Sequence, residues 1–208
     1  MQPVRSRPGK IVCVGRNYRE HARELGNEVP KEPLLFLKPP SSIVWGGEAI
    51  VLPTASKRVE HEGEIGVVIG RTLTRVSEAD AARAIRSIVA VNDVTARDLQ
   101  KTDGQWTRAK GFDTFCPLGE ESSELPDLDS LTVVARVNGV ERQRGKSSEM
   151  VFSIPSLLAY ISQIMPLEPG DLVATGTPSG VGPLVPGDVV EIEIPGVSRV
   201  TNPVQESR

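Results

Sequence analysis

The residues with the clearest capacity for chemistry are three carboxylates, Glu62, Glu64 and Asp93. Glu62 and Glu64 stand at the start of the apolar run EIGVVIG, and in a strand both side chains would point to one face. Charges about 6.7 Å apart along a strand repel by roughly 2–3 kcal/mol at an effective dielectric of about 20, unless solvent, a basic side chain or a cation offsets them. Asp93 closes the apolar run IVAVN, at the end of another expected strand. Three oxygen ligands without histidine or cysteine suit Mg²⁺, Mn²⁺ or Ca²⁺ rather than zinc.

The spacing leaves an ordinary interpretation open. In it, the two glutamates lie on a solvated strand and pair with Arg58 or Arg71, and Asp93 only forms a turn. Nothing in the sequence requires the aspartate to meet the glutamates. Gly66 and Gly70 continue the face of the glutamates, and such small residues would leave room for a ligand beside the acids.

A histidine and a glutamate lie three residues apart in RNYREHARELG, which has helical propensity and ends at Gly26. His21 and Glu24 would then be neighbours on one helical face. A carboxylate that orients an imidazole makes a general base, and the alternative is a surface ion pair. His61 adjoins the acids in sequence but points to the opposite strand face, so it is not counted as a ligand.

Two further segments could hold an anionic substrate. Lys110 lies between aromatic residues in WTRAKGFD, either as a partly buried cation or as a surface lysine whose stem packs on apolar groups. The segment TGTPSGVGP (175–183) follows a strand directly and could offer backbone N–H groups to a carboxylate. It lacks the GK[ST] ending of a phosphate loop, so a nucleotide site is disfavoured, and a plain hairpin connection is the alternative.

Short strands separated by turns must position these residues. Strands are predicted at KIVCVG (10–15), EIGVVIG (64–70), IVAVND (88–93), LTVVARV (131–137), DLVATG (171–176) and VVEIEI (189–194). Asn138-Gly139 predicts a hairpin. Helices are predicted over EADAARAIRSI (78–88), with Ser77 as cap, and from Pro155 to the residue before Pro166. The pattern predicts one β-rich α+β domain with a few peripheral helices, because turns rather than helices separate most strands.

The composition excludes several classes of protein. The 208 residues carry 24 Lys plus Arg against 27 Asp plus Glu, a net charge of −3, which argues against nucleic acid as the main partner. No apolar run approaches the ~20 residues needed to cross a membrane, and no signal-peptide pattern opens the chain. Cys13 lies within IVCV and is expected to be a small buried hydrophobe, and no Cys/His cluster suggests zinc. A cytoplasmic location is expected.

Taken together, these segments make the chain resemble the fumarylacetoacetate hydrolase family over about residues 10–195. The matching pieces are GRNYREHARELG, FLKPPSSI, HEGEIGVVIG, VNDVTARDLQ, WTRAKGFDTFCP, VNGVERQ, MVFSIPSLLAYIS and GDLVATGTPSGVGP. The arrangement is most similar to the short acylpyruvate hydrolase and oxaloacetate decarboxylase members. The resemblance implies a mixed β-sheet roll, a bound Mg²⁺ or Mn²⁺, and commonly a homodimer. It also implies one catalytic domain over residues 1–208, without the N-terminal domain of larger relatives; we expect a short arm at 1–9 and a tail at about 196–208 that finishes a strand and frays.

The same resemblance assigns roles to individual residues. It makes Glu62 and Glu64 of the E-x-E motif and Asp93 of NDVTARD the metal ligands. The residues that resemble substrate contacts at the keto-acid end are Lys110, Gln100 and Thr177, with Arg16 of GRNY as a further candidate. His21 and Glu24 match a pair carried on a lid over the ligand, so the candidate catalytic residues are His21, Glu24 and Lys110.

The implied chemistry is metal-dependent cleavage of a C–C bond in a small anionic 2-keto acid. The carboxylate and keto oxygen would chelate the metal, and negative charge would collect on that oxygen as a pyruvate enolate. For an acylpyruvate, His21 would activate the attacking water, whereas oxaloacetate would lose CO₂ without one. Two alternatives stay open: an isomerase or tautomerase of a 2-hydroxymuconate-like or oxaloacetate-like acid (the 2-hydroxyhepta-2,4-diene-1,7-dioate isomerase type), and a non-catalytic metabolite-binding module.

Overall fold

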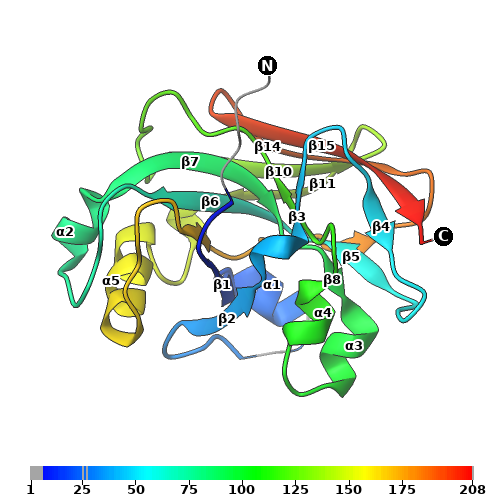
Figure 1. The fold of residues 1–208 in the computed structure, drawn as a ribbon, viewed down its shortest axis with the longest axis horizontal. Coiled ribbons are helices and arrows are strands. Elements are labelled where there is room, and N and C mark those ends of the chain that lie inside the picture. Colours follow the sequence, from blue (N-terminus) through cyan, green and yellow to red (C-terminus); the bar gives the residue numbers. More distant parts are fainter. Residues whose placement is uncertain (1–6, 25, 27, 208) are drawn as a thin grey trace.

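A seven-stranded mixed sheet runs through the centre of the protein, in a computed structural model that describes residues 7–24, 26 and 28–207 (Figure 1). Across the sheet its strands are β2 (Leu34–Lys38), β1 (Ile11–Gly15), β12 (Leu172–Ala174), β6 (Gly63–Ile69), β7 (Ile85–Asn92), β9 (Cys116–Leu118) and β3 (Ile43–Trp45). β1 is parallel to β12 and β3 is parallel to β9, whereas the other neighbours are antiparallel. The predicted strand-rich, mixed architecture is therefore confirmed.

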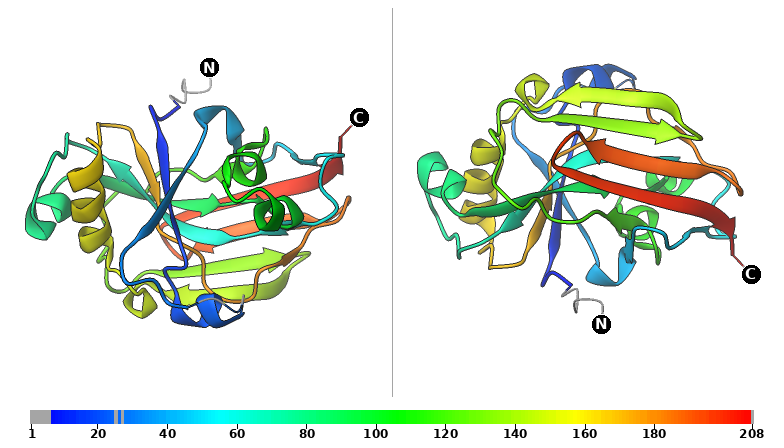
Figure 2. Two further views of the ribbon diagram at one scale, coloured as in Figure 1. Left: turned by 90° about the horizontal axis from the view of Figure 1, so that it is seen from below. Right: turned by 90° about the horizontal axis from the view of Figure 1, so that it is seen from above.

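A second, five-stranded sheet covers one face of the first. Its strands are, in order, β11 (Val140–Lys146), β10 (Thr132–Val137), β14 (Val189–Ile194), β15 (Ser198–Glu206) and β4 (Ile50–Leu52). Figure 1 shows this layer above β6 and β7, and the right-hand view of Figure 2 looks down on it. Buried side chains of both sheets, among them Ile65, Val133 and Ile192, form the core between the layers. A small third sheet consists of β13 (Gly182–Pro183), β5 (Val59–His61) and β8 (Thr95–Ala96).

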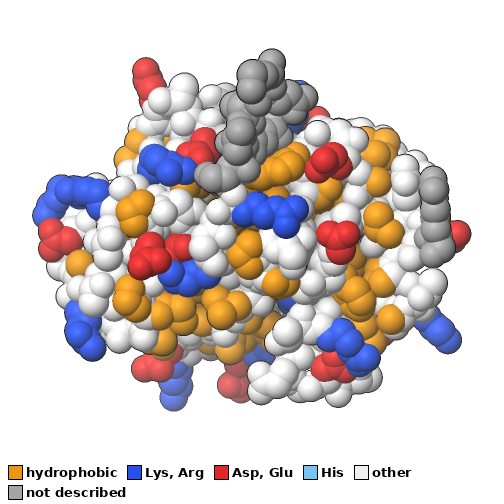
Figure 3. All heavy atoms as spheres, in the orientation of Figure 1, with side chains coloured by type: hydrophobic (Ala, Val, Ile, Leu, Met, Phe, Trp, Pro, Cys, Tyr) orange, Lys and Arg blue, Asp and Glu red, His pale blue; other side chains and the backbone are white. Residues whose placement is uncertain are grey.

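The helices are short and lie at the periphery. They are α1 (Arg19–Glu24), α2 (Glu78–Ala82), α3 (Arg97–Thr102), α4 (Thr107–Gly111) and α5 (Ile154–Ile164), with single 3₁₀ turns at Pro40–Ser42 and Ser147–Glu149. The helix predicted to begin near Pro155 is confirmed as α5, whose Ser153 cap accepts the Ser156 N–H. None of the described helices has the length and apolar character needed to cross a membrane. Acidic and basic side chains are interspersed over the face drawn in Figure 3, as expected from the nearly balanced charge.

The strand β6 places the acidic residues. Its odd-numbered residues point into the core between the sheets, so Glu64 and the other even-numbered residues point to the opposite face. The space beside Gly66 is filled, because a Cβ atom there would lie 2.4 Å from Cγ2 of Val91. Gly70 likewise packs against Arg86. The expectation that these glycines leave room for a ligand is therefore wrong; they allow close packing within the sheet.

Two segments differ from their predicted structure. The helix predicted over 78–88 ends at Ala82, although Ser77 caps it as expected. Residues from Ile85 onward form β7 instead, because their side chains are buried by pairing with β6, and this tertiary packing overrides local helix propensity.

The tail finishes a strand, β15, as expected, but the expected fraying is wrong for the residues of that strand. This strand pairs with β14 on one side and β4 on the other, and alternate side chains such as Val200 and Val204 are buried. Residues 1–6 of the expected N-terminal arm lie outside the described residues. The predicted hairpin at Asn138-Gly139 joins β10 to β11, with φ of 53° and 76° at the two residues.

Candidate active site

Glu62, Glu64 and Asp93 meet at one end of the β6–β7 pair. The antiparallel register sets Gly63 opposite Asn92, so the residue before one and the residue after the other become neighbours. The Asp93 N–H donates to the Glu62 carbonyl at 2.8 Å. One carboxylate oxygen from each of the three acids lies within 4.8 Å of the others, and all three side chains are buried. The register of β6 against β7 thus brings the three acids together, which their spacing in the sequence did not require. We call Glu62, Glu64 and Asp93 the carboxylate triad.

Three buried basic side chains surround the triad. Lys110 of α4 places its Nζ 2.8 Å from Glu62 Oε2 and 2.6 Å from Asp93 Oδ2. Lys38, at the end of β2, donates to the other oxygen of Asp93 at 2.8 Å. Arg97, at the start of α3, donates to Glu62 Oε1. Burial opposes the charge on Lys110, but Asp93 and Glu62 outweigh it and hold the pKa of the ammonium above its ordinary value.

Glu64 has no basic partner among the residues that the structure describes. Its Oε2 accepts the Gly176 N–H at 2.8 Å. Burial and the charges of Asp93 and Glu62 raise the pKa of Glu64 well above its usual value. Burial also raises the pKa of Glu62, but the charges of Lys110 and Arg97, which contact its carboxylate, outweigh burial. The pKa of Glu62 therefore lies below its usual range. A divalent cation would supply the positive charge that Glu64 lacks, so the donor set fits a hard ion such as Mg²⁺ or Mn²⁺.

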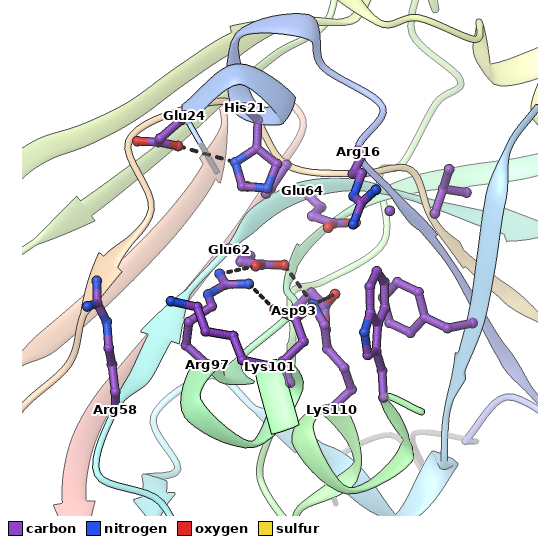
Figure 4. Close-up of a pocket in the computed structure, with 16 residues that line it drawn as sticks. Arg16, His21, Glu24, Arg58, Glu62, Glu64, Asp93, Arg97, Lys101 and Lys110 are labelled. Carbon is purple, nitrogen blue, oxygen red and sulfur yellow. Dashed lines mark hydrogen bonds and ion pairs between the residues drawn. The ribbon is translucent and has the colours of Figure 1, made fainter. Parts of the chain in front are cut away.

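The predicted histidine–glutamate pair lies across the cavity from the triad. His21 Nδ1 is 3.3 Å from Glu24 Oε2, and the imidazole is buried. Figure 4 shows the other edge of the ring turned toward Glu62 and Glu64. Glu24 Oε1 also accepts the Gly180 N–H at 3.0 Å, which joins α1 to the 175–183 segment. The N–H groups of Gly176 and Gly180 in that segment thus bind carboxylates of the protein itself.

Gln143, a buried glutamine of β11, ties the triad to the 175–183 segment. Its Oε1 accepts the Gly63 N–H at 2.9 Å and lies 3.1 Å from His61 Nδ1. Its Nε2 donates to Thr177 Oγ1 and to the Pro178 carbonyl, both at 2.8 Å. Because that carbonyl can only accept and the Gly63 N–H can only donate, the amide orientation is fixed and His61 Nδ1 must carry a proton. His61 is thereby engaged away from the triad, as its strand position predicted.

A cavity of about 470 Å³ opens over the triad. It is lined by every residue that the sequence analysis singled out for the site: Arg16, His21, Glu24, Glu62, Glu64, Asp93, Gln100, Lys110 and Thr177. An apolar wall is added by Val14, Phe36 and Trp106, and further basic groups by Arg58, Arg97 and Lys101. The Phe36 and Trp106 rings meet edge to face with centroids 5.1 Å apart, and Lys110 Nζ lies 4.9 Å from the Phe36 ring centre.

Sequence reasoning missed three residues that hold the site together, Lys38, Arg97 and Gln143. Arg97 lies within the NDVTARD segment, four residues after Asp93, and could have been noticed there. Lys38 ends the apolar run LLFLK, where a buried lysine signals a partner of opposite charge. Gln143 carries no comparable signal, because its partners come from segments far away in the sequence.

Comparisons with known proteins identify the family. The family model described as Fumarylacetoacetate (FAA) hydrolase C-terminal matches residues 10–205. The mitochondrial oxaloacetate tautomerase of Caenorhabditis elegans is 44% identical over 188 residues, covering 88% of this chain and 88% of the relative. The mitochondrial oxaloacetate decarboxylase of Dictyostelium discoideum is 43% identical over 195 residues, covering 90% of this chain and 89% of the relative.

Solved structures with similar sequences have the same fold as this chain. The 5-carboxymethyl-2-hydroxymuconate delta-isomerase from Mycobacterium smegmatis aligns with a TM-score of 0.90 and 44% identity, over 97% of this chain and 80% of that chain. The family match includes every residue of the cavity and all strands of the three sheets except Glu206 at the end of β15. The chain therefore belongs to the fumarylacetoacetate hydrolase family.

Proposed function

We propose that this chain is a divalent-metal-dependent enzyme that breaks a C–C bond in a small 2-keto acid, by decarboxylating oxaloacetate, hydrolysing an acylpyruvate, or both. The observation that carries the proposal is the placing of the carboxylate triad and the His21–Glu24 pair on facing sides of one cavity. The names of the relatives from Dictyostelium discoideum and Caenorhabditis elegans support oxaloacetate as a substrate.

In the proposal, Glu62, Glu64 and Asp93 hold Mg²⁺ or Mn²⁺. When bound, the ion supplies positive charge beside the keto oxygen, where negative charge collects as the C–C bond breaks. Lys110 acts at the same end of the substrate: two of the three N–H donors of its ammonium are engaged by the triad, which leaves the third for the substrate. Its fixed position in a buried site makes this electrostatic contribution larger than it would be in water.

His21 moves the proton. Glu24 can only accept, so His21 Nδ1 donates to it and the Nε2 lone pair is available on the cavity side. In hydrolysis, Nε2 takes a proton from water as the water oxygen bonds to the distal carbonyl carbon. The bond between that carbon and C3 then breaks, its electrons pass toward the keto oxygen, and His21 returns the proton to C3. In decarboxylation, CO₂ leaves with no attacking water, the electrons of the broken C–C bond pass toward the keto oxygen, and C3 takes a proton from solvent, which His21 Nε2 can relay.

A tautomerase or isomerase is the second candidate. The observation that favours it is the same His21, which could take a proton from C3 and deliver it to the keto oxygen, so that a C–H bond breaks and an O–H bond forms while every C–C bond stays intact. The names of the relatives from Caenorhabditis elegans and Mycobacterium smegmatis point the same way. A non-catalytic binding module would have no use for a histidine that a carboxylate orients toward the ligand.

Product analysis by NMR separates these activities. Oxaloacetate and acetylpyruvate are each incubated with the protein and Mg²⁺, with His21→Gln and a protein-free Mg²⁺ solution as controls. Pyruvate from oxaloacetate above the Mg²⁺ blank supports decarboxylation, and acetate plus pyruvate from acetylpyruvate supports hydrolysis. Faster keto–enol exchange without new products favours the tautomerase. Intact substrates with no faster exchange would refute all three.

The proposal also includes a homodimer that works in the cytoplasm. The assembly is tested by light scattering on the purified chain, for which a monomer mass would count against this part.

A further inference from the structure

A buried lysine holds Asp93 from outside the cavity. Lys38 Nζ donates to Asp93 Oδ1 at 2.8 Å and to the Val94 carbonyl at 3.1 Å, and the Lys38 side chain is fully buried. The lining of the cavity does not include Lys38. A substrate in the cavity therefore does not contact this ammonium, and the proposed mechanism leaves it without a role.

The sequence around Lys38 fixes the position of its side chain. Lys38 is the last residue of β2, where it lies opposite Ile11 of β1, and it precedes Pro39, which confines its backbone to an extended conformation. The ring centre of Phe115, itself fully buried, lies 6.0 Å from Lys38 Nζ. Because close packing encloses the whole side chain, Asp93 Oδ1 stays engaged for as long as this part of the core is folded.

The other two acids of the triad also have one oxygen held by a donor besides Lys110. Arg97 donates to Glu62 Oε1, and the Gly176 N–H donates to Glu64 Oε2 at 2.8 Å. Arg97 lines the cavity, where its guanidinium could turn to a bound ligand, and Gly176 donates from its backbone. Lys38 is thus the side chain in this group of three donors that a ligand in the cavity does not reach.

The number of carboxylate oxygens that Asp93 can offer bears on the choice of ion. Ca²⁺ takes about 6–8 oxygen ligands at roughly 2.3–2.6 Å and often binds both oxygens of one carboxylate. Mg²⁺ demands near-octahedral geometry at about 2.0–2.1 Å and keeps several waters. A two-oxygen contact between an ion and Asp93 would need Oδ1, which Lys38 already occupies. Asp93 is therefore limited to one oxygen, which deprives Ca²⁺ of a ligand that Mg²⁺ does not need.

We propose that Lys38 is a positioning residue that selects the ion: by holding Asp93 as a one-oxygen ligand, it makes the triad favour Mg²⁺ or Mn²⁺ over Ca²⁺. The inference deepens the proposed function and rests on it, because the triad must first bind a divalent ion. The selection follows from the atom that Lys38 occupies and not from its charge, since a nearby charge acts alike on all ions of charge +2.

Calorimetric titrations of the metal-free protein with Mg²⁺, Mn²⁺ and Ca²⁺ test the inference without requiring turnover. We expect the wild-type protein to bind Mg²⁺ and Mn²⁺ about tenfold or more tighter than Ca²⁺. In Lys38→Met, Asp93 Oδ1 is released, so the ratio of the Mg²⁺ and Ca²⁺ affinities should shift toward Ca²⁺ by about tenfold. Loss of a positive charge strengthens the binding of both ions, and a general loosening of the structure weakens both, so neither effect moves the ratio.

Lys10→Met is the matched control, because Lys10 Nζ also pairs with a buried aspartate, Asp171, at 2.5 Å, and does so away from the cavity. It should keep the wild-type ratio. Wild-type protein that binds Ca²⁺ as tightly as Mg²⁺ would overturn the inference even if Lys38→Met failed to fold. An unchanged ratio in Lys38→Met, or an equal shift in Lys10→Met, would overturn it as well. Failure of all three ions to bind would instead overturn the proposed function, and the inference with it.

Discussion

Replacing Lys110 with methionine removes a charge on which two of the three triad acids depend. The Lys110 side chain is 2% exposed, and its Nζ lies 2.8 Å from Glu62 Oε2 and 2.6 Å from Asp93 Oδ2. Removing one partner of such a buried pair destabilises a protein by about 3–5 kcal/mol. For a chain of this size, 1 kcal/mol changes Tm by roughly 2–4 °C. We therefore expect metal-free Lys110→Met to melt on the order of 10 °C below the wild-type protein.

Magnesium should reverse part of this loss. Without Lys110 the triad has one more uncompensated negative charge, so a divalent ion should bind the variant more tightly. Each tenfold gain in affinity adds about 1.4 kcal/mol of stabilisation at saturating metal. The rise in Tm on adding Mg²⁺ should thus be larger for the variant than for the wild-type protein, by roughly 3–5 °C per tenfold gain.

Scanning calorimetry with EDTA and then with Mg²⁺ measures both effects. Arg108→Met is the matched control, because Arg108 lies on the same helix but pairs with Asp103 in solvent, with 56% of its side chain exposed. It should change neither Tm nor the response to Mg²⁺. The reasoning is refuted if metal-free Lys110→Met melts within about 2 °C of wild type, or if Mg²⁺ raises both melting temperatures equally.

Three further predictions follow from the site. His21→Gln should slow turnover by about two to four orders of magnitude while Mg²⁺ affinity stays unchanged in calorimetry; wild-type turnover would remove His21 from the mechanism. The raised pKa of Glu64 means that the metal-free protein holds a proton the unfolded chain releases, so its stability falls as pH rises through that pKa. Mg²⁺ affinity should rise over the same range by up to about tenfold per pH unit, and calorimetric titrations giving one affinity at every pH from the ordinary pKa of a glutamate upward would contradict this. Gln143→Met would leave the Gly63 N–H and the Pro178 carbonyl without their partner, and urea unfolding should register a loss of about 2–5 kcal/mol, an expectation that a loss below 1 kcal/mol would contradict.

The sequence pattern correctly predicted features that depend only on neighbouring residues, such as the faces of a strand and a hairpin turn. The period of two in β6 placed Glu64 and Ile65 on opposite faces, and the Asn138-Gly139 pair predicted a hairpin that the structure has. The three acids could be named from residue type and strand position. Their meeting could not, because it depends on the register of β6 against β7.

Tertiary packing decided what local pattern could not. Ile85 begins a strand rather than continuing the helix from Glu78, because β6 offers a partner that no window of sequence reveals. The space beside Gly66 belongs to Val91 of the neighbouring strand. Gln143 escaped notice for the same reason, since its partners are 34 to 82 residues away along the chain.

During synthesis on the ribosome, this site stays incomplete until the 175–183 segment has been made. Glu62 and Asp93 are made within one short stretch of the chain, but Glu64 waits for Gly176, 112 residues later, and Glu24 waits for Gly180, 156 residues later. At about 5–20 residues per second, that interval is on the order of ten seconds or more. For that time α1 has no partner in the 175–183 segment, although His21 has already been made. The three acids and the His21–Glu24 pair have therefore all been made before the 175–183 segment, which joins Glu64 to Glu24 through Gly176 and Gly180, and the site is completed only when the last quarter of the chain has emerged.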